Sequence, residues 1–229
     1  MNCAIIMAAG RGSRMKVNKN KQFILIQGKP ILAYTIDKFQ RSPLIDEIII
    51  VAAESEINFC MQEIVYKYKF NKVKNIVSGG SERQQSVMNG LKAVKSANIV
   101  LIHDGARPFV DNKIIENGIK YAEKYGGAAC GVQPKDTIKI KSEDGFSEKT
   151  IDRSKLFCVQ TPQCFKYDSI LKAHINAEKE GILATDDTMI FEMSGNKVYL
   201  YDGSYENLKI TTPDDLYAAE TLLKKNSIQ

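Results

Sequence analysis

Cationic side chains that follow a glycine-rich turn near the start of the chain have the spacing most suggestive of chemistry. Residues 3–7 form a short apolar run, typical of a buried parallel strand, which leads into Ala8-Ala9-Gly10-Arg11-Gly12. Backbone N–H groups in such a turn can approach a phosphate closely, because no bulky side chain stands at its apex. Four cations follow within a few residues: Arg14, Lys16, Lys19 and Lys21. The combination predicts a triphosphate-binding site.

Two better-known phosphate motifs do not fit this turn. A dinucleotide fingerprint needs a third glycine where the chain has Met15, and no G-x-x-x-x-G-K-[ST] sequence is present. The remaining alternative is a tight strand-to-helix turn with a solvated basic face. Arg14 and Lys21 favour the phosphate site over that alternative.

A second glycine turn and a strand-end carboxylate come later in the chain. Gly79 and Gly80 precede Ser81, which together with Gln84 has the spacing of a helix capping box. Residues 98–102 form the most apolar strand, which ends in His103-Asp104-Gly105-Ala106-Arg107-Pro108. Ligands of open α/β sheets bind at the carboxyl ends of strands, so Asp104 is the candidate Mg²⁺ ligand. Its alternative role is an N-cap or turn residue.

Two neighbours of Asp104 have roles that the sequence leaves open. His103 could act as a base, but a single histidine at a strand end is more often packed and hydrogen-bonded. Arg107 could bind a phosphate or hold Asp104 in place. The sequence does not separate these two roles.

Strand and helix patterns alternate along most of the chain, which predicts a mostly parallel sheet covered on both faces. Strands are expected at 45–52, in a short segment ending at Val77, at 128–132 and at 197–201. Helices are expected at 29–41, 54–68, from Ser81 to about 94, from Asp111 to Gly126, at 168–179, from 185 toward 192, and after Thr212 as N-cap. Residues 160–163, which follow Val159, resemble the T-P-Q turn of the family named below. Residues 137–151 alternate around a turn at 142–145 and predict an inserted β-hairpin.

Composition limits the class of protein. The chain has 229 residues, 44% of them hydrophobic, and a formal net charge of +5, which suits one domain and a small anionic substrate. No long basic run indicates nucleic acid, and no apolar segment reaches membrane-spanning length. The five cysteines are odd in number and lack C-x-x-C spacing, so we expect reduced packing residues in a cytoplasmic protein.

The motifs together resemble a known family. A-A-G-x-G-x-R-M followed by K-Q is similar to the opening of sugar-phosphate and polyol-phosphate nucleotidyltransferases. G-G-x-E-R-x-x-S, H-D-[AG]-A-R-P, K-D-T, D-R, T-P-Q and N-x-K-x-T-T-P-x-D-L narrow the resemblance to the 2-C-methyl-D-erythritol 4-phosphate cytidylyltransferases of the non-mevalonate isoprenoid pathway, from Ala4 to about Leu223. Lys16 and Asn20 depart from the glycine and proline that the family usually has there.

The resemblance implies a fold, an assembly and a reaction. The fold would be a single-domain Rossmann-like nucleotidyltransferase fold over residues 1–229, with a projecting β-arm at about 135–155 that forms a homodimer. The reaction would join CTP and 2-C-methyl-D-erythritol 4-phosphate and release pyrophosphate, with Mg²⁺ as cofactor. A ribitol-5-phosphate cytidylyltransferase is the alternative enzyme, and a non-catalytic nucleotide-binding module on the same fold is a further one.

Roles for individual residues follow from the same resemblance. The catalytic cations would be Arg14, Lys21 and Lys209. CTP would be bound by Ala8, Ala9, Gly10, Gly12, Gly80, Ser81, Ser86 and Gly105. The acceptor phosphate and its carbon chain would be bound by Arg107, Thr137, Arg153, Thr161 and Thr185. The metal ligand would be Asp104.

Overall fold

A seven-stranded sheet forms the centre of the molecule in a computed structural model that describes residues 1–10 and 20–226. Its order is β11-β7-β10-β6-β1-β4-β5. The strand bounds are β1 Asn2–Ala8, β4 Glu47–Ala52, β5 Val73–Ser78, β6 Ile99–Asp104, β7 Gly127–Val132, β10 Cys158–Lys166 and β11 Tyr199–Asp202. Every neighbouring pair is parallel except those of β10, which runs antiparallel to β6 and β7. The predicted mostly parallel α/β fold is confirmed.

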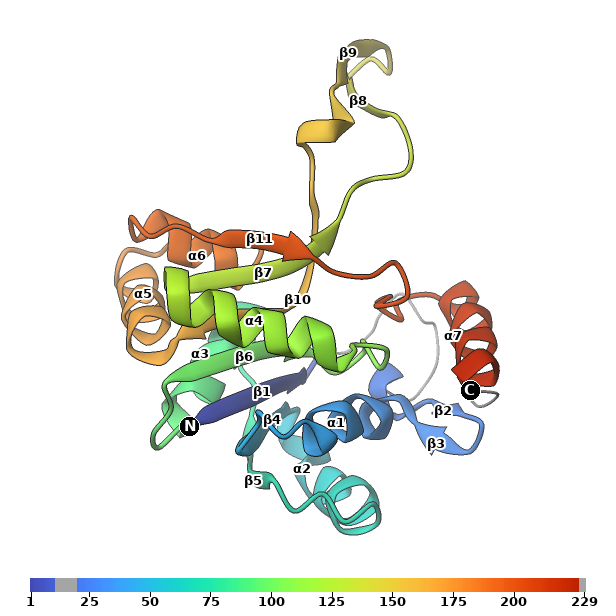
Figure 1. The fold of residues 1–229 in the computed structure, drawn as a ribbon, viewed down its shortest axis with the longest axis vertical. Coiled ribbons are helices and arrows are strands. Elements are labelled where there is room, and N and C mark those ends of the chain that lie inside the picture. Colours follow the sequence, from blue (N-terminus) through green and yellow to red (C-terminus); the bar gives the residue numbers. More distant parts are fainter. Residues whose placement is uncertain (11–19, 227–229) are drawn as a thin grey trace.

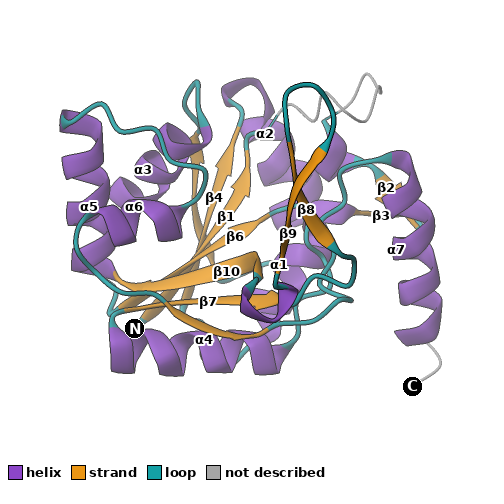
Figure 2. Cartoon of the chain, turned by 90° about the horizontal axis from the view of Figure 1, so that it is seen from above, coloured by secondary structure: helices purple, strands orange, loops and turns teal. Residues whose placement is uncertain are grey.

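Helices cover both faces of this sheet (Figures 1 and 2). Alternate residues of β1 divide between them: Ala4 and Ile6 pack with α1 and α4, whereas Ile5 packs with α3, α5 and α6. The helix bounds are α1 Ile31–Arg41, α3 Arg83–Ala93, α4 Asn112–Tyr125, α5 Tyr167–Lys179, α6 Asp187–Met193 and α7 Pro213–Asn226. Because both faces of the sheet centre are buried, the central strands β1, β4 and β6 are continuous apolar runs, as the sequence indicated.

The segment predicted as a helix over 54–68 is helical but unevenly wound. It consists of a 3₁₀ turn at Glu54–Glu56, a short α2 at Ile57–Phe59 and a π-helical stretch at Cys60–Tyr66. The wide turns are visible in the hydrogen bond from Lys67 N to Gln62 O, at 3.3 Å. Its apolar side chains face the core, since Cys60 and Ile64 are fully buried.

The interpretation of residues 160–163 as a turn was wrong. They lie in the middle of β10, where Thr161 and Gln163 are almost completely buried. A proline in a central strand argues against strand structure, because it lacks the N–H that a ladder needs. The structure accommodates Pro162 at an irregularity, since the pairing of β10 with β7 shifts register between Val159 and Gln163.

The predicted helix ends divide into correct and incorrect cases. Asp111 caps α4 as expected, accepting a hydrogen bond from Ile114 N at 2.7 Å, and α4 ends at Gly126 with φ of 91°. The capping box of Ser81 and Gln84 was wrong: α3 begins at Arg83 without a side-chain cap. Gln84 instead bonds across to a distant segment, donating to Ile182 O at 3.0 Å.

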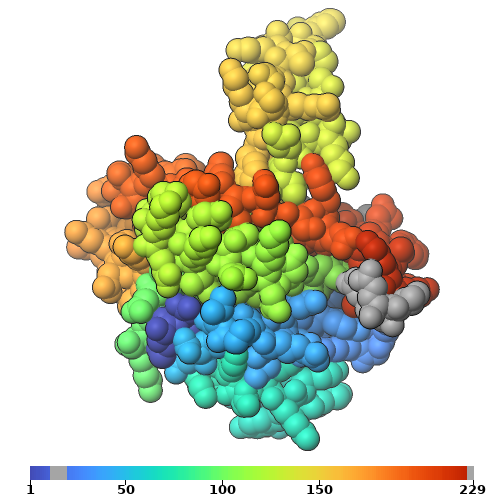
Figure 3. Space-filling model, viewed as in Figure 1, coloured from blue at the N-terminus to red at the C-terminus, as the bar shows by residue number. Residues whose placement is uncertain are grey.

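The predicted hairpin is confirmed and projects from the body of the molecule (Figures 1 and 3). Its strands are β8 Ile138–Lys141 and β9 Ser147–Ile151, and they form a separate two-stranded sheet. A second small hairpin, β2 Leu25–Ile26 with β3 Lys29–Pro30, lies near α7. We call residues 135–155 the β-arm.

Two further expectations concern membrane segments and thiols. No helix within residues 1–10 and 20–226 is long and apolar enough to cross a membrane. The five cysteines are free thiols, and four of them are buried as expected of packing residues, whereas Cys158 is exposed.

Candidate active site

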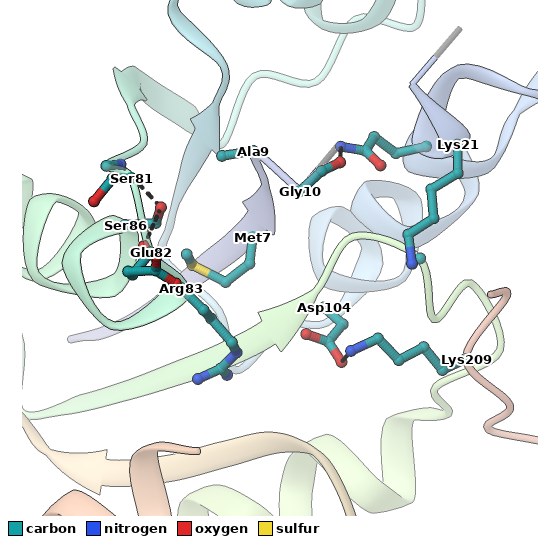
Figure 4. A pocket seen from close by; sticks show the side chains of 13 residues that line it. Met7, Ala9, Gly10, Lys21, Ser81, Glu82, Arg83, Ser86, Asp104 and Lys209 are labelled. Atoms are coloured by element: carbon teal, nitrogen blue, oxygen red, sulfur yellow. Dashed lines mark hydrogen bonds and ion pairs between the residues drawn. The ribbon is translucent and has the colours of Figure 1, made fainter. Parts of the chain in front are cut away.

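An open pocket of about 630 Å³ lies where β1 and β6 end (Figure 4). That volume is in the range of small-molecule sites, and the position is the one where open α/β sheets bind ligands. The wall is built from the turn after β1, the turn before α3, the end of β6 and the segment before α7. It is lined by Met7, Ala9, Gly10, Lys21, Gln22, Gly80, Ser81, Glu82, Arg83, Ser86, Asp104, Ala106 and Lys209.

The two glycine turns lie against each other at one side of this pocket. A Cβ at Gly79 would stand 2.4 Å from Ala9 Cβ, so the close approach of the turns requires glycine there. Within the second turn, Ser86 Oγ accepts a hydrogen bond from Gly80 N at 2.9 Å. Ala9, Gly10, Gly80, Ser81 and Ser86, which the sequence suggested as CTP contacts, all line this pocket.

The first turn is held from behind by a residue to which the sequence assigned no role. Gln22 is almost completely buried, and its side-chain amide donates hydrogen bonds to Ala8 O and to Gly10 O. Ala8 is therefore a buried support of the turn, and its carbonyl is already engaged. Gly12 and Arg14, which were predicted to bind phosphate, lie outside the described residues.

Two predicted cations and the predicted carboxylate meet on the other side of the pocket. Lys209 Nζ lies 2.8 Å from Asp104 Oδ2, and the Lys21 side chain extends into the same space (Figure 4). Lys21 stands in a 3₁₀ turn, Lys21–Phe23. Lys209 is carried by a segment whose Ile210 N bonds to Ala106 O at 2.9 Å. Residues 188 positions apart in the sequence, Lys21 and Lys209, thus reach one cavity.

A hydrogen-bond network beneath the pocket fixes Asp104. The N–H of Asp104 donates to Thr161 Oγ1 at 3.1 Å, and the same hydroxyl lies 3.1 Å from His103 Nδ1. His103 Nε2 lies 3.1 Å from the carbonyl of Arg107. Because a carbonyl only accepts, Nε2 carries the proton and Nδ1 accepts from the Thr161 hydroxyl. His103 is fully buried.

The same surroundings set the protonation states of His103 and Asp104. Burial lowers the pKa of His103 to about 4, so the ring is neutral at physiological pH. Burial alone would raise the pKa of Asp104, but the positive charges of Lys209, Arg83 and Arg107 hold it well below its ordinary value. The site therefore offers a permanently ionised carboxylate, and His103 is a packed residue.

The donor set of the pocket fits a magnesium ion held in part by substrate. Mg²⁺ is usually bound by one or two carboxylates together with substrate phosphate oxygens. Among residues 1–10 and 20–226, no group of three His, Cys, Asp or Glu side chains could form a cage of its own. Asp104 is ionised and faces the pocket, and its ion pairs with Arg107 and Lys209 use Oδ2. A single carboxylate with phosphate oxygens is therefore the arrangement that these residues suit.

Several predicted acceptor-binding residues lie outside this pocket. Thr137 and Arg153 are exposed on the β-arm, and Thr185 is exposed just before α6. Thr161 is 5% exposed and belongs to the network under Asp104. Arg107 pairs with Asp104 at 3.5 Å and donates to Asn207 O at 2.7 Å, which favours the second of its two expected roles.

Gly105, predicted to contact CTP, is turned into the protein. Its N–H donates to Met7 O at 2.9 Å, and its carbonyl accepts from Thr35 Oγ1 at 2.8 Å. A Cβ there would stand 2.9 Å from Met7 O, so glycine allows β1 and the end of β6 to approach. The role that this geometry supports is packing.

Arg83 is the main pocket residue to which the sequence assigned no role. Its guanidinium lines the pocket and pairs with Asp187 Oδ2 at 2.7 Å. The G-G-S-E-R sequence placed it beside the second glycine turn, but its partner lies 104 positions away. Only the tertiary structure brings the two together.

In this α/β fold the pocket lies where the parallel strands β1 and β6 end. In it, cations face a pair of glycine turns (Figure 4). That combination, on a sheet with a projecting arm, defines the protein as a nucleotidyltransferase. A family model described as 2-C-methyl-D-erythritol 4-phosphate cytidylyltransferase matches residues 2–225. The chain belongs to this family.

Individual relatives agree with the family model. A relative named 2-C-methyl-D-erythritol 4-phosphate cytidylyltransferase from Clostridium kluyveri is 59% identical over 223 residues, which cover 97% of this chain and 96% of that protein. One of the same name from Clostridium perfringens is 52% identical over 221 residues, covering 96% and 98%. The solved structure of 4-diphosphocytidyl-2C-methyl-D-erythritol synthase from Anaerococcus prevotii has a TM-score of 0.86 at 32% identity, covering 97% of this chain and 96% of that chain.

Proposed function

We propose that this protein transfers the cytidylyl group of CTP to 2-C-methyl-D-erythritol 4-phosphate. An oxygen of the acceptor phosphate attacks the α-phosphorus of CTP, the bond between the α-phosphorus and the bridging oxygen to the β-phosphorus breaks, and pyrophosphate leaves. The products are 4-diphosphocytidyl-2-C-methyl-D-erythritol and pyrophosphate. The observation that carries the proposal is the meeting of Lys21, Lys209 and Asp104 opposite the glycine turns, in a chain of this family.

The attacking group needs no general base, because a phosphate is already ionised at neutral pH. What the site must supply is positive charge, since two anions approach each other and negative charge shifts toward the leaving group. Lys21 and Lys209 supply it from side chains that are already directed into the pocket. The neutral, buried His103 takes no proton in this scheme.

We propose Mg²⁺ as the cofactor, with Asp104 as its protein ligand. A bound Mg²⁺ would neutralise phosphate charge and orient the triphosphate. Asp104 suits this role because its pKa is held below the ordinary value and it remains ionised. Lys209 and Arg107 fix the carboxylate from one side.

The test of the reaction is pyrophosphate release from CTP with purified protein and a panel of acceptors. We expect steady release with 2-C-methyl-D-erythritol 4-phosphate and a much lower kcat/KM with ribitol 5-phosphate. A ribitol product in excess, at equal concentrations of the two acceptors, would reject the proposed acceptor. Absence of release with every acceptor would support a non-catalytic nucleotide-binding module.

We further propose that the protein is a homodimer in which the β-arm completes the partner's acceptor site. The arm exposes apolar side chains that its own body does not cover: Ile138 is 36%, Ile140 44% and Phe146 72% exposed. Several exposed apolar side chains on one small hairpin favour a protein contact. Arg153 and Thr137 lie on the same arm and outside the pocket of their own chain.

Mixing two defective variants tests this arrangement. Arg153→Ala and Lys209→Ala should each be nearly inactive, whereas dimers re-formed from an equal mixture should recover about a quarter of the wild-type activity, because half are hybrids with one intact site. If the arm served its own chain, both sites of a hybrid would stay defective and no activity would return. Sedimentation of the unmixed protein as a monomer would also count against the dimer.

A cytoplasmic location completes the proposal. The support is chemical: the five cysteines are free, and four are buried as packing residues. Proteins of oxidising compartments more often pair such residues. Fractionation of cells that express a tagged chain would test this location.

A further inference from the structure

Three polar residues form a continuous chain from the interior to the wall of the pocket. His174, on α5, lies with Nε2 3.2 Å from Asp187 Oδ1, on α6. The other carboxylate oxygen of Asp187 accepts from Arg83 Nη2, on α3, at 2.7 Å. His174 and Asp187 are 1% and 0% exposed. Two buried ionisable side chains are thus linked by hydrogen bonds to one guanidinium at the pocket wall.

The pairing with Asp187 makes Arg83 a fixed donor at the pocket. A fully buried carboxylate requires a partner, and Asp187 has the guanidinium and the imidazole N–H. Burial would raise the pKa of Asp187, but Arg83 and His174 keep it below its ordinary value, so the carboxylate is ionised. The ion pair therefore fixes the orientation of the Arg83 guanidinium. Its planar fork has further N–H groups, and 35% of the side chain remains exposed.

The position of Arg83 places those N–H groups away from Lys21 and Lys209, the two cations expected to bind phosphate. In Figure 4, the guanidinium lies across the pocket from Lys21 and Lys209, and Asp104 stands between them. Arg83 is close enough to Asp104 to help lower the pKa of that carboxyl. The side chain extends away from Ser81 and Ser86, the expected nucleotide contacts, toward α6.

Residues 182–187, which include the Arg83 partner Asp187, are also held in place by other side chains. Ala184 N donates to Gln84 Oε1 at 3.2 Å, and Asp187 N donates to Gln163 Oε1 at 3.1 Å. Residues 182–187 are thus fastened to α3 and β10. This segment contains Thr185, one of the residues expected to contact the acceptor.

We propose that Arg83 binds the acceptor through its carbinol hydroxyls, and that Asp187 and His174 are positioning residues that orient its guanidinium. The inference rests on the proposed function. Arg83 lies across the pocket from Lys21 and Lys209 (Figure 4). Its guanidinium is held in one orientation by Asp187, so its remaining N–H groups form a fixed planar set of donors that suits hydroxyl oxygens. Arg83 would therefore help to select the carbon chain of the acceptor.

Steady-state kinetics of Arg83→Lys test the first part. Lysine keeps the charge but loses the fork, so the KM for 2-C-methyl-D-erythritol 4-phosphate should rise about 10- to 100-fold while the KM for CTP stays within about twofold. Arg41→Lys, at an arginine on α1 that is exposed, is the matched control and should change neither constant. An unchanged acceptor KM, or an equal rise in both constants, overturns the proposal.

Two further comparisons test the positioning residues. His174→Gln keeps a donor near the position of Nε2, whereas His174→Leu removes it; we expect the leucine variant to lower kcat/KM for the acceptor several-fold and the glutamine variant to restore most of it. Asp187→Asn added to Arg83→Lys should cost no further kcat/KM, because Asp187 acts through Arg83. Additive losses, or equal kinetics in the two His174 variants, reject the positioning role.

The wild-type protein separates this inference from the proposed function. If it forms no product with either acceptor, the proposed function fails and the inference fails with it. If it turns over normally and Arg83→Lys does as well, only the inference fails. Should ribitol 5-phosphate be the better acceptor, the same variants are measured with it, since it also carries carbinol hydroxyls.

Discussion

Replacing Thr161 by valine should lower the free energy of unfolding, and the size of the loss can be worked out from the structure. The Thr161 hydroxyl accepts from Asp104 N and donates to His103 Nδ1, both at 3.1 Å, in a region where His103 is fully buried. Valine has nearly the same shape but leaves both groups unpaired. At about 1–3 kcal/mol for each unpaired buried group, the expected loss is about 2–6 kcal/mol. That is a large part of the roughly 5–15 kcal/mol that stabilises a typical domain.

Urea unfolding followed by circular dichroism measures this loss. Thr161→Ser is the control, because it keeps the hydroxyl and removes one buried methyl group, at about 1 kcal/mol. The valine variant should unfold at clearly lower urea than the serine variant. A valine variant of wild-type stability, with a raised KM for the acceptor, would refute this reasoning and return Thr161 to the substrate-binding role that its sequence motif suggested.

Four other predictions concern the site and its supports. Lys21→Ala and Lys209→Ala should each lower kcat by about 10²–10³-fold with unchanged circular dichroism, and normal turnover would remove either residue from the mechanism. Asp104→Asn should raise the Mg²⁺ concentration needed for half-maximal activity, and an unchanged titration would make Asp104 structural. Burial alone would raise the pKa of Asp215. The hydrogen bonds that its carboxylate accepts from N–H groups at the start of α7 outweigh this effect and hold the pKa below its ordinary value. Its stabilising effect is therefore present above about pH 4 and is lost as the pH falls through the lowered pKa of the folded state, so Asp215→Asn should unfold more easily than wild type at pH 7, and the difference should shrink as the pH is lowered further below about 4. Deletion of residues 139–149 should give a poorly active monomer. Sedimentation and the pyrophosphate assay test this, and a persisting dimer or full activity would contradict it.

Local patterns determined the parts of this protein that depend on neighbouring residues. Continuous apolar runs gave the parallel strands, because a strand buried on both faces has no polar alternation. The Asp111 cap, the glycine at the end of α4 and the β-arm hairpin were predicted for the same reason: each depends on a few adjacent side chains. The glycine turns and the strand-end Asp104 marked the pocket, since parallel strands end at one edge of a sheet.

Contacts between distant segments could be decided only by the tertiary structure. The T-P-Q motif suggested a turn at residues 160–163, but the sheet accepts Pro162 in a strand, at an irregularity in the β7 pairing. Thr161 looked like a substrate contact, whereas folding directs its hydroxyl to His103 and the backbone of Asp104. The partner of Arg83 lies 104 positions away, and no spacing rule covers such a distance. The partner of a buried charge is the residue that the tertiary structure brings next to it. Sequence patterns therefore locate the site, whereas packing determines the roles of its residues.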